Sequence, residues 1–311
     1  MSAMTGKKTF GKRLKRDLTK NWFLYLMIAP VLIYFIVYHY LPMYGVQMAF
    51  KDYHIKQGIL GSPFVGLKHF KRFFSSYNFK NLLLNTLGVS IYSLAAGFPI
   101  PIIFALLLNY LKSNKLKKVT QMVSYAPHFI STVVICSMIS IFTTKDTDLF
   151  NILRGLVGLE PVSFLSKPEW FKSIYVWSGV WQSTGWSAII YISALSGVDY
   201  QMHEAAIIDG ASKLQRMRHI DLPSIKPTII MLLILNLGSM MSVGFEKVYL
   251  LQNDLNRSTS SIISTYVYEQ GLVKQNYSFS TAVGLFNSVI NFILLVSANT
   301  ISKKLFDESL F

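Results

Sequence analysis

EAAIIDGASKLQRMRHIDLP, residues 204–223, is a mixed-charge stretch between two long apolar segments. The chain around it has 311 residues, of which 52% are hydrophobic and only 14% charged. Soluble domains carry about 25% charged residues, and a membrane-spanning helix needs about 20 mainly apolar ones. Several windows meet that length, so the sequence predicts an all-α, polytopic membrane protein in which this stretch forms an ordered polar loop.

The local chemistry of the loop predicts two short helices. Asp199 can cap the first, and Gly210 supplies the left-handed residue that ends it. Ser212 opens the second, with Gln215 three residues later completing a capping box. Pro223 and Pro227 are expected to end the second helix before the next apolar segment. The prediction is a compact, rigid hairpin over residues 199–226.

Six membrane spans form one transmembrane domain over residues 22–301. The expected spans are 22–40, 81–111, 121–142, 173–198, 227–244 and 281–301. The second is long for one straight crossing, and GFPIP, residues 97–101, should kink it. A basic segment, 1–21, precedes the domain, and a short tail, 302–311, follows it.

Loop charge predicts the orientation of these spans. If the N-terminus lies inside, the inside segments hold seventeen of the thirty Lys and Arg residues. The outside segments hold fewer although they are longer in total. Positive loops favour the cytoplasm, so both termini and the hairpin are expected there. GLKHFKRFF, residues 66–74, is an outlying basic cluster on the other side and resembles a short helix at the headgroup layer.

The net charge of +15 does not indicate nucleic-acid binding, because none of the nucleic-acid fold signatures is present. Basic residues in membrane proteins mostly mark cytoplasmic loops and contacts with anionic lipid. Cys136 is the single cysteine, so no disulfide can form within the chain. No Cys/His spacing indicates a metal site.

The hairpin resembles the EAA motif of permease subunits in ABC importers. The pattern E-A-A-x3-G-x9-I-x-L-P is met at every fixed position. The resemblance implies the type I importer fold and a role in coupling to a cytoplasmic ATPase. The residues it assigns to coupling are Glu204, Ala205, Ala206, Asp209, Gly210, Arg216, Ile220, Leu222 and Pro223. Arg216 and Arg218 could instead face anionic headgroups.

The resemblance also implies partners. The chain has no G-x-x-x-x-G-K-[ST] loop, so ATP and Mg²⁺ would be held by a separate ATPase and no cofactor by this chain. Two ATPase subunits need two hairpins, which implies a second, homologous permease in a bacterial plasma membrane. Flanking segments such as YAPHFIS, residues 125–131, and GFEKVYLL, residues 244–251, resemble the complex-oligosaccharide branch. That branch implies an oligosaccharide cargo delivered by an extracellular solute-binding protein.

Polar side chains within the spans are candidates for the translocation path, because such groups normally face protein or a water-filled cavity. Amides beside tryptophan suit the hydroxyls and apolar ring faces of a sugar. The candidates are Trp181, Gln182, Asn236, Ser239, Asn287 and Asn291. Asparagine can also simply join neighbouring helices.

Other readings of the same residues stay open. The cargo could be a peptide, an amino acid or a lipid-like solute. A proton-coupled secondary transporter would need acidic relays, of which the spans have few. No constellation at membrane depth indicates an enzyme. His128 is expected to be structural, and Glu246 could act at a gate or simply be solvated.

Overall fold

The computed structural model describes residues 17–143 and 149–306, and predictions for residues 1–16 and 307–311 lie outside them. Within the described residues every element is a helix, apart from one isolated β-bridge between Lys51 and Phe64. The prediction of an all-α protein is therefore confirmed.

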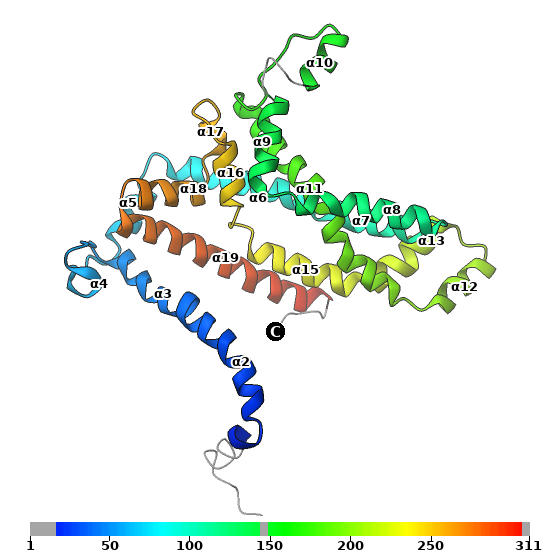
Figure 1. The fold of residues 1–311 in the computed structure, drawn as a ribbon, viewed down its shortest axis with the longest axis horizontal. Helices are drawn as coiled ribbons and strands as arrows, with labels where there is room; N and C mark the ends of the chain where they lie inside the picture. Colours follow the sequence, from blue (N-terminus) through cyan, green and yellow to red (C-terminus); the bar gives the residue numbers. More distant parts are fainter. Residues whose placement is uncertain (1–16, 144–148, 307–311) are drawn as a thin grey trace, which may run out of the picture.

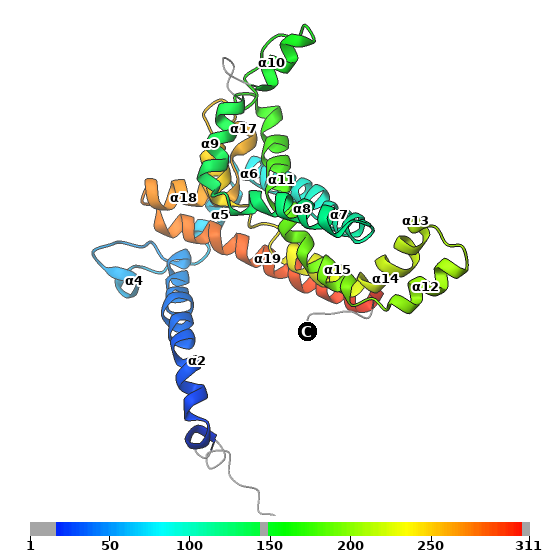
Figure 2. The same cartoon turned by 45° about the vertical axis from the view of Figure 1, so that its right-hand side comes forward.

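The α2 part of the first span stands away from the rest of the molecule (Figures 1 and 2), while its end at η2 packs on α19 (Tyr277–Phe306). The span is continuous through α2 (Trp22–Phe35), the π-turn η1 (Ile36–Tyr40), α3 (Leu41–Met43) and the 3₁₀ segment η2 (Tyr44–Phe50). None of its most apolar window is buried against the chain. An apolar helix with no protein cover must face lipid or another subunit.

The loop after the first span contains α4 (Gly58–Gly61) and α5 (Lys68–Phe74). The predicted short basic helix forms as α5, but it does more than lie on headgroups, since His69 and Phe73 are buried. The Phe73 ring contacts Phe79 and Phe286 with centroid separations of 5.1 and 5.5 Å. Aromatic packing therefore fixes α5 against the second span and the last helix.

The second span is broken where the prolines predict it. α6 (Phe79–Gly97) and α7 (Pro99–Asn109) meet at Phe98. Pro99 and Pro101 have no N–H to continue the hydrogen-bond ladder of α6. The two helices together still form one candidate span of 31 residues.

The span expected over 121–142 is sharply bent. It consists of α8 (Asn114–Tyr125) with η3 (Ala126–Phe129), followed by α9 (Thr132–Thr143), at an angle of 95°. Pro127 removes a backbone donor, and Ile130 is extended at φ −77°, ψ 129°. The chain therefore leaves the helix and re-enters it in a new direction.

The fifth span is also shorter than expected. α15 (Lys226–Gly238) ends six residues before the predicted boundary at 244. Beyond Gly238 the backbone no longer makes α-helical hydrogen bonds, and Met241 N instead donates to Asn291 Oδ1 at 2.8 Å. A side chain on another helix thus replaces the next helical turn.

The remaining helices complete the body. They are α10 (Leu149–Leu156), α11 (Pro168–Ser196), α12 (Tyr200–Ile208), α13 (Lys213–Arg216), η4 (Met217–Asp221), α14 (Leu222–Ser224), α16 (Phe245–Leu251), α17 (Arg257–Ser260), α18 (Ile263–Tyr268), η5 (Glu269–Val273) and α19 (Tyr277–Phe306). By length and composition three helices of the described chain can span a membrane, or five if each bent pair counts once. α11 has 29 residues but is not among them. Six spans thus remain a prediction.

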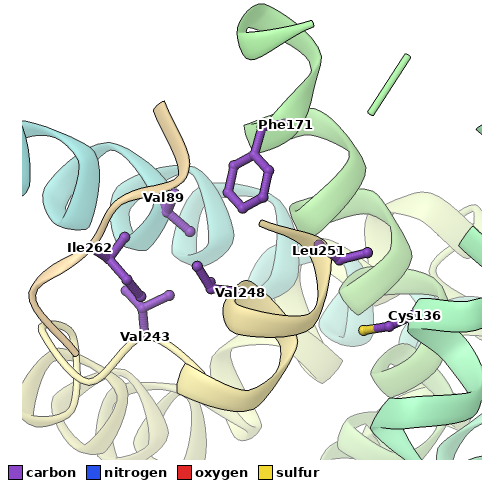
Figure 3. Close-up of a cluster of buried hydrophobic side chains, with 7 residues drawn as sticks. All are labelled: Val89, Cys136, Phe171, Val243, Val248, Leu251 and Ile262. Atoms are coloured by element: carbon purple, nitrogen blue, oxygen red, sulfur yellow. The ribbon is translucent and has the colours of Figure 1, made fainter. Parts of the chain in front are cut away.

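Three apolar clusters hold the body together. The cluster in Figure 3 joins α6, α9, α11 and α16 around Phe171, Val248 and Leu251. A second joins α7, α11 and the start of α15 around Tyr191 and Ile225. The third joins α5, α6, α18 and α19. α11 therefore belongs to two of the three, which makes it the central helix.

Gly185 gives a test of this packing. Its α11 backbone passes so close to α8 that an added Cβ would lie 2.2 Å from the Ser124 carbonyl oxygen. Because that oxygen belongs to the backbone, Gly185→Ala should force the helices apart and destabilise the protein by about 1–3 kcal/mol. The measurement is the thermal melting midpoint in detergent. Gly284→Ala is the control, since its Cβ would meet nothing within 4 Å; equal melting of both variants would contradict the close contact.

Candidate functional site

The hairpin begins with a capped helix, as predicted. Asp199 Oδ1 accepts a hydrogen bond from Gln201 N at 2.9 Å and opens α12. Gly210 follows the helix at φ +78°, the left-handed region that glycine occupies without strain. Its N–H donates to Ile207 O, and Ala211 N donates to Ala206 O, at 3.0 and 2.8 Å. This Schellman pair satisfies the last carbonyls of α12 and fixes the turn.

The second arm opens on the predicted capping box. Ser212 N donates to Gln215 Oε1 at 2.7 Å, and Gln215 N donates to Ser212 Oγ at 3.4 Å. Both ends of the connection are therefore held by local hydrogen bonds. The two arms form the protrusion at one end of the molecule in Figures 1 and 2.

The expected stop at Pro223 and Pro227 needs a correction. The helix passes through Pro223 and ends at Ser224, while Pro227 lies in the first turn of α15 after a bend of 61°. The π-turn η4 makes this possible, since Leu222 N donates to Met217 O. Proline has no N–H to donate within a helix, and the wider π-turn just before Pro223 lets the helix continue without that hydrogen bond.

Most motif residues face outward. Glu204, Ala205, Asp209, Gly210, Leu222 and Pro223 are exposed, Ala206 and Arg216 are partly covered, and Ile220 is buried. Large apolar side chains beside them are also uncovered, with Ile208 85% and Leu214 72% exposed. Exposed apolar groups clustered on a rigid protrusion mark an interaction surface.

A buried carboxylate holds the base of the hairpin. Asp221 is fully buried, and Tyr110 Oη donates to its Oδ2 at 2.5 Å. His203 Nε2 lies 3.2 Å from Oδ1, and the Arg216 guanidinium lies over the Tyr110 ring at 5.6 Å. These contacts join both arms to the residue that follows α7.

Tyr110, His203 and Asp221 were not among the predicted site residues. Asp221 fills a variable position of the motif, and the other two lie outside the fixed pattern. The sequence does hold one indication of the role of Asp221, which is an acidic residue between the apolar Ile220 and Leu222. A carboxylate buried at such a position needs a hydrogen-bond partner. Its partner Tyr110 is 111 residues away, which spacing alone cannot identify.

A cavity of about 880 Å³ opens between α6, α7, α11, α15 and α16. Its lining combines apolar side chains with many hydroxyl and amide groups. The polar and charged lining residues are Ser90, Ser93, Thr132, Gln182, Ser183, Thr184, Ser187, Asn236, Ser239, Ser242, Glu246 and Lys247. Such a surface can exchange hydrogen bonds with a polar solute.

Three of the predicted path residues line this cavity: Gln182, Asn236 and Ser239. Gln182 Nε2 donates to Ile130 O at 3.1 Å, across the break between η3 and α9. Asn236 Nδ2 donates to Leu232 O at 2.7 Å, within its own helix. The structure therefore brings residues of the fourth and fifth predicted spans to one wall.

The other three lie elsewhere. Trp181 lines two smaller hollows, one beside α8 and one beside α9. Asn291 accepts from Met241 N and donates to Ser242 Oγ at 2.8 Å, so it joins α19 to the end of α15. Asn287 Oδ1 is buried and makes no hydrogen bond within the described chain. Helix joining is the alternative expected for such asparagines.

Trp186 supplies the aromatic surface that was expected from Trp181. It lines the cavity, is 45% exposed, and stacks on His128 at 4.5 Å with the ring planes 4° apart. Trp181 and Trp186 are five residues apart on α11, which turns them to different faces. The positions of α6, α7, α15 and α16 around α11 decide which of its faces borders the cavity.

No group of three or more His, Cys, Asp or Glu side chains in residues 17–143 and 149–306 could hold a metal ion. The helical body, the polar cavity and the rigid exposed hairpin are features of a membrane permease. Residues 97–307 match the family described as "Binding-protein-dependent transport system inner membrane component". The chain belongs to this family, and it is a membrane protein.

Relatives and solved structures agree over nearly the whole length. Protein LplB of Bacillus subtilis is 47% identical over 96% of this chain and 92% of its own. The polygalacturonan/rhamnogalacturonan transport system permease protein YteP of the same species is 45% identical over 100% and 97%. A chain in the crystal structure of a bacterial ABC transporter for the acidic polysaccharide alginate has a TM-score of 0.88 and 38% identity, covering 94% and 99%. These likenesses confirm the ABC importer permease fold.

The buried base of the hairpin is testable. Tyr110→Phe leaves Asp221 Oδ2 without its donor, which should cost about 1–3 kcal/mol. The hairpin should loosen as a unit, so backbone amides of α12 should exchange with deuterium faster. Tyr77→Phe is the control, because Tyr77 is 92% exposed. Unchanged exchange in Tyr110→Phe would show that this hydrogen bond does not hold the hairpin.

Proposed function

We propose that this chain forms half of the translocation path of an ATP-driven importer for an oligosaccharide or complex glycan. The observation that carries the proposal is the motif hairpin, which is locked by caps at its turn, tied by Asp221 at its base, and exposed along its motif residues. A stiff element can transmit a displacement that a flexible loop would lose.

The hairpin docks on a separate ATPase that binds ATP and Mg²⁺. Ile208 and Leu214 supply the apolar contact, and Glu204 and Asp209 supply exposed charge beside it. Burial of such apolar anchors drives association. The hairpin then lies in the cytoplasm with both termini, as the loop charges favour.

A second permease completes the path. One chain offers one hairpin, and an importer driven by two ATPases requires two. The uncovered first span and the open cavity both leave surface for a homologous partner. The complex lies in a bacterial plasma membrane, where lipid covers what the partner does not.

The cargo follows from the cavity and the relatives. Hydroxyl and amide groups beside the Trp186 ring suit sugar hydroxyls and ring faces. YteP is named for polygalacturonan and rhamnogalacturonan transport. A chain with TM-score 0.89 and 37% identity, covering 96% of this chain and 100% of its own, comes from the alginate transporter in complex with an alginate pentasaccharide-bound periplasmic protein. An extracellular binding protein therefore delivers the sugar here too.

Coupling through the hairpin can be tested with Glu204→Lys and Gly210→Pro. Proline cannot adopt φ +78°, and it removes the N–H that bonds Ile207 O. Glu204→Lys reverses a charge on the docking surface. We expect each variant to assemble but to lower ATP-dependent uptake by at least about tenfold, the loss that follows from about 1.4 kcal/mol of contact energy. The measurement is uptake of labelled oligosaccharides in proteoliposomes that hold the complete transporter.

Glu160→Lys is the matched control, because Glu160 is exposed and follows α10 by four residues in the sequence. The helices α10 and α12 lie far apart in both views (Figures 1 and 2). It should transport at the wild-type rate. Wild-type uptake by a correctly assembled Glu204→Lys/Gly210→Pro double variant would refute the coupling role. Uptake of labelled peptides or amino acids in place of oligosaccharides would refute the cargo class alone.

A further inference from the structure

Lys247 is a buried cation on the wall of the cavity. Only 9% of the residue is exposed, and its Nζ donates to the Tyr175 backbone oxygen at 3.0 Å. The ammonium also lies 5.0 Å from the centroid of the Tyr175 ring. The ammonium also lies near Gly179, where an added Cβ would be 3.4 Å from Nζ.

The helix that carries Lys247 is held firmly. Val248 and Leu251 of α16 are buried in the apolar cluster with Cys136 and Phe171 (Figure 3). Close packing on that cluster keeps α16 in one position beside α11. Lys247 therefore lines the cavity from a rigid support.

This ammonium has no carboxylate partner in the described part of the chain. None of the ion pairs found there includes Lys247, although buried charges are normally paired. Glu246, the neighbouring residue, also lines the cavity but is exposed and makes no ion pair with it. Burial lowers the pKa of Lys247 to about 8, which is still above neutral pH, so the ammonium form prevails at pH 7.

An unpaired buried ammonium favours an anion over a neutral solute. It carries three donors, of which one goes to Tyr175. A carboxylate would accept a charge-assisted hydrogen bond and offset the cost of desolvating the cation. A sugar hydroxyl would offset less of it. Ser242 and Asn236 on the same lining can hold the neutral hydroxyls of such a ligand.

We propose that Lys247 is an anion-recognition residue of the cavity and that the transported oligosaccharide carries carboxylates, as uronic acid units do. The proposal rests on the proposed function, because it names the charge class of that cargo. A purely structural Lys247 would serve only to hold the Tyr175 carbonyl. An anion-recognition role makes the transporter prefer acidic over neutral sugars through Lys247, whereas a structural role does not.

The test compares Lys247→Met and Lys247→Arg in the complete transporter with its binding protein, reconstituted in proteoliposomes. The probes are oligogalacturonate and oligoalginate, each also with its carboxyl groups reduced to neutral alcohols. Lys247→Met should lower ATP-dependent uptake of the acidic probes at least about tenfold more than that of the neutral forms. Lys247→Arg keeps the charge and should retain most of the preference. Lys274→Met is the control, because Lys274 is 53% exposed, pairs with Glu269, and does not line the cavity.

Equal loss of acidic and neutral uptake in Lys247→Met, together with a lower melting midpoint, would overturn the proposal in favour of a structural lysine. Unchanged uptake in Lys247→Met would overturn it as well. If the wild type imports neutral oligosaccharides with ATP but no acidic probe, the charge class is wrong and the proposed function stands. If it imports none of the sugars with ATP, the proposed function itself fails.

Discussion

The hydrogen bond from Tyr110 to the buried carboxylate of Asp221 joins the hairpin to the membrane body. Met217 adds an apolar contact with the cluster of α7 and α11, while the arms of the hairpin are mostly exposed. Tyr110 directly follows α7, and the opposite end of α7 contributes Phe98 and Pro101 to the region of the cavity. α7 therefore connects the base of the hairpin to the cavity, as do α11 and α15, between which the hairpin lies in the sequence. These helices are the physical link between the proposed docking surface and the proposed path.

The cavity depends on a second constraint, which is that polar groups in an apolar body need partners. The Asn291 side chain hydrogen-bonds to Met241 N and to Ser242 Oγ just after α15 ends. The polypeptide can therefore leave the helix beside the cavity without leaving these two groups unpaired. The break between η3 and α9 is bridged in the same way by Gln182. Both irregular segments border the cavity, where non-helical backbone is tolerated in membrane proteins. The breaks are thus part of how the wall is built, and Lys247 lies on that wall with its charge unpaired in the described chain.

The first span needs cover from outside this chain. Its apolar helix is uncovered along its most hydrophobic window, and such a surface faces lipid or another subunit. The proposed homologous permease is one surrounding that fits it. The apolar tip of the hairpin, with Ile208 and Leu214 exposed, likewise fits the proposed ATPase partner.

The sequence by itself determined the helical membrane class, the caps of the hairpin and the turn at Gly210. The membrane class follows from composition and the length of the apolar segments. The caps and the turn depend on hydrogen bonds among residues at most five positions apart, so a short stretch contains all the information they need. The sequence also predicted six residues for one path, of which Gln182, Asn236 and Ser239 line one cavity. Only the tertiary structure decided that Trp186 and not Trp181 borders the cavity, that Asn291 joins two helices, and that Asp221 meets Tyr110. Those outcomes depend on how helices far apart in the chain pack against each other, and the 95° bend and the π-turn before Pro223 set that packing in ways the local pattern does not encode.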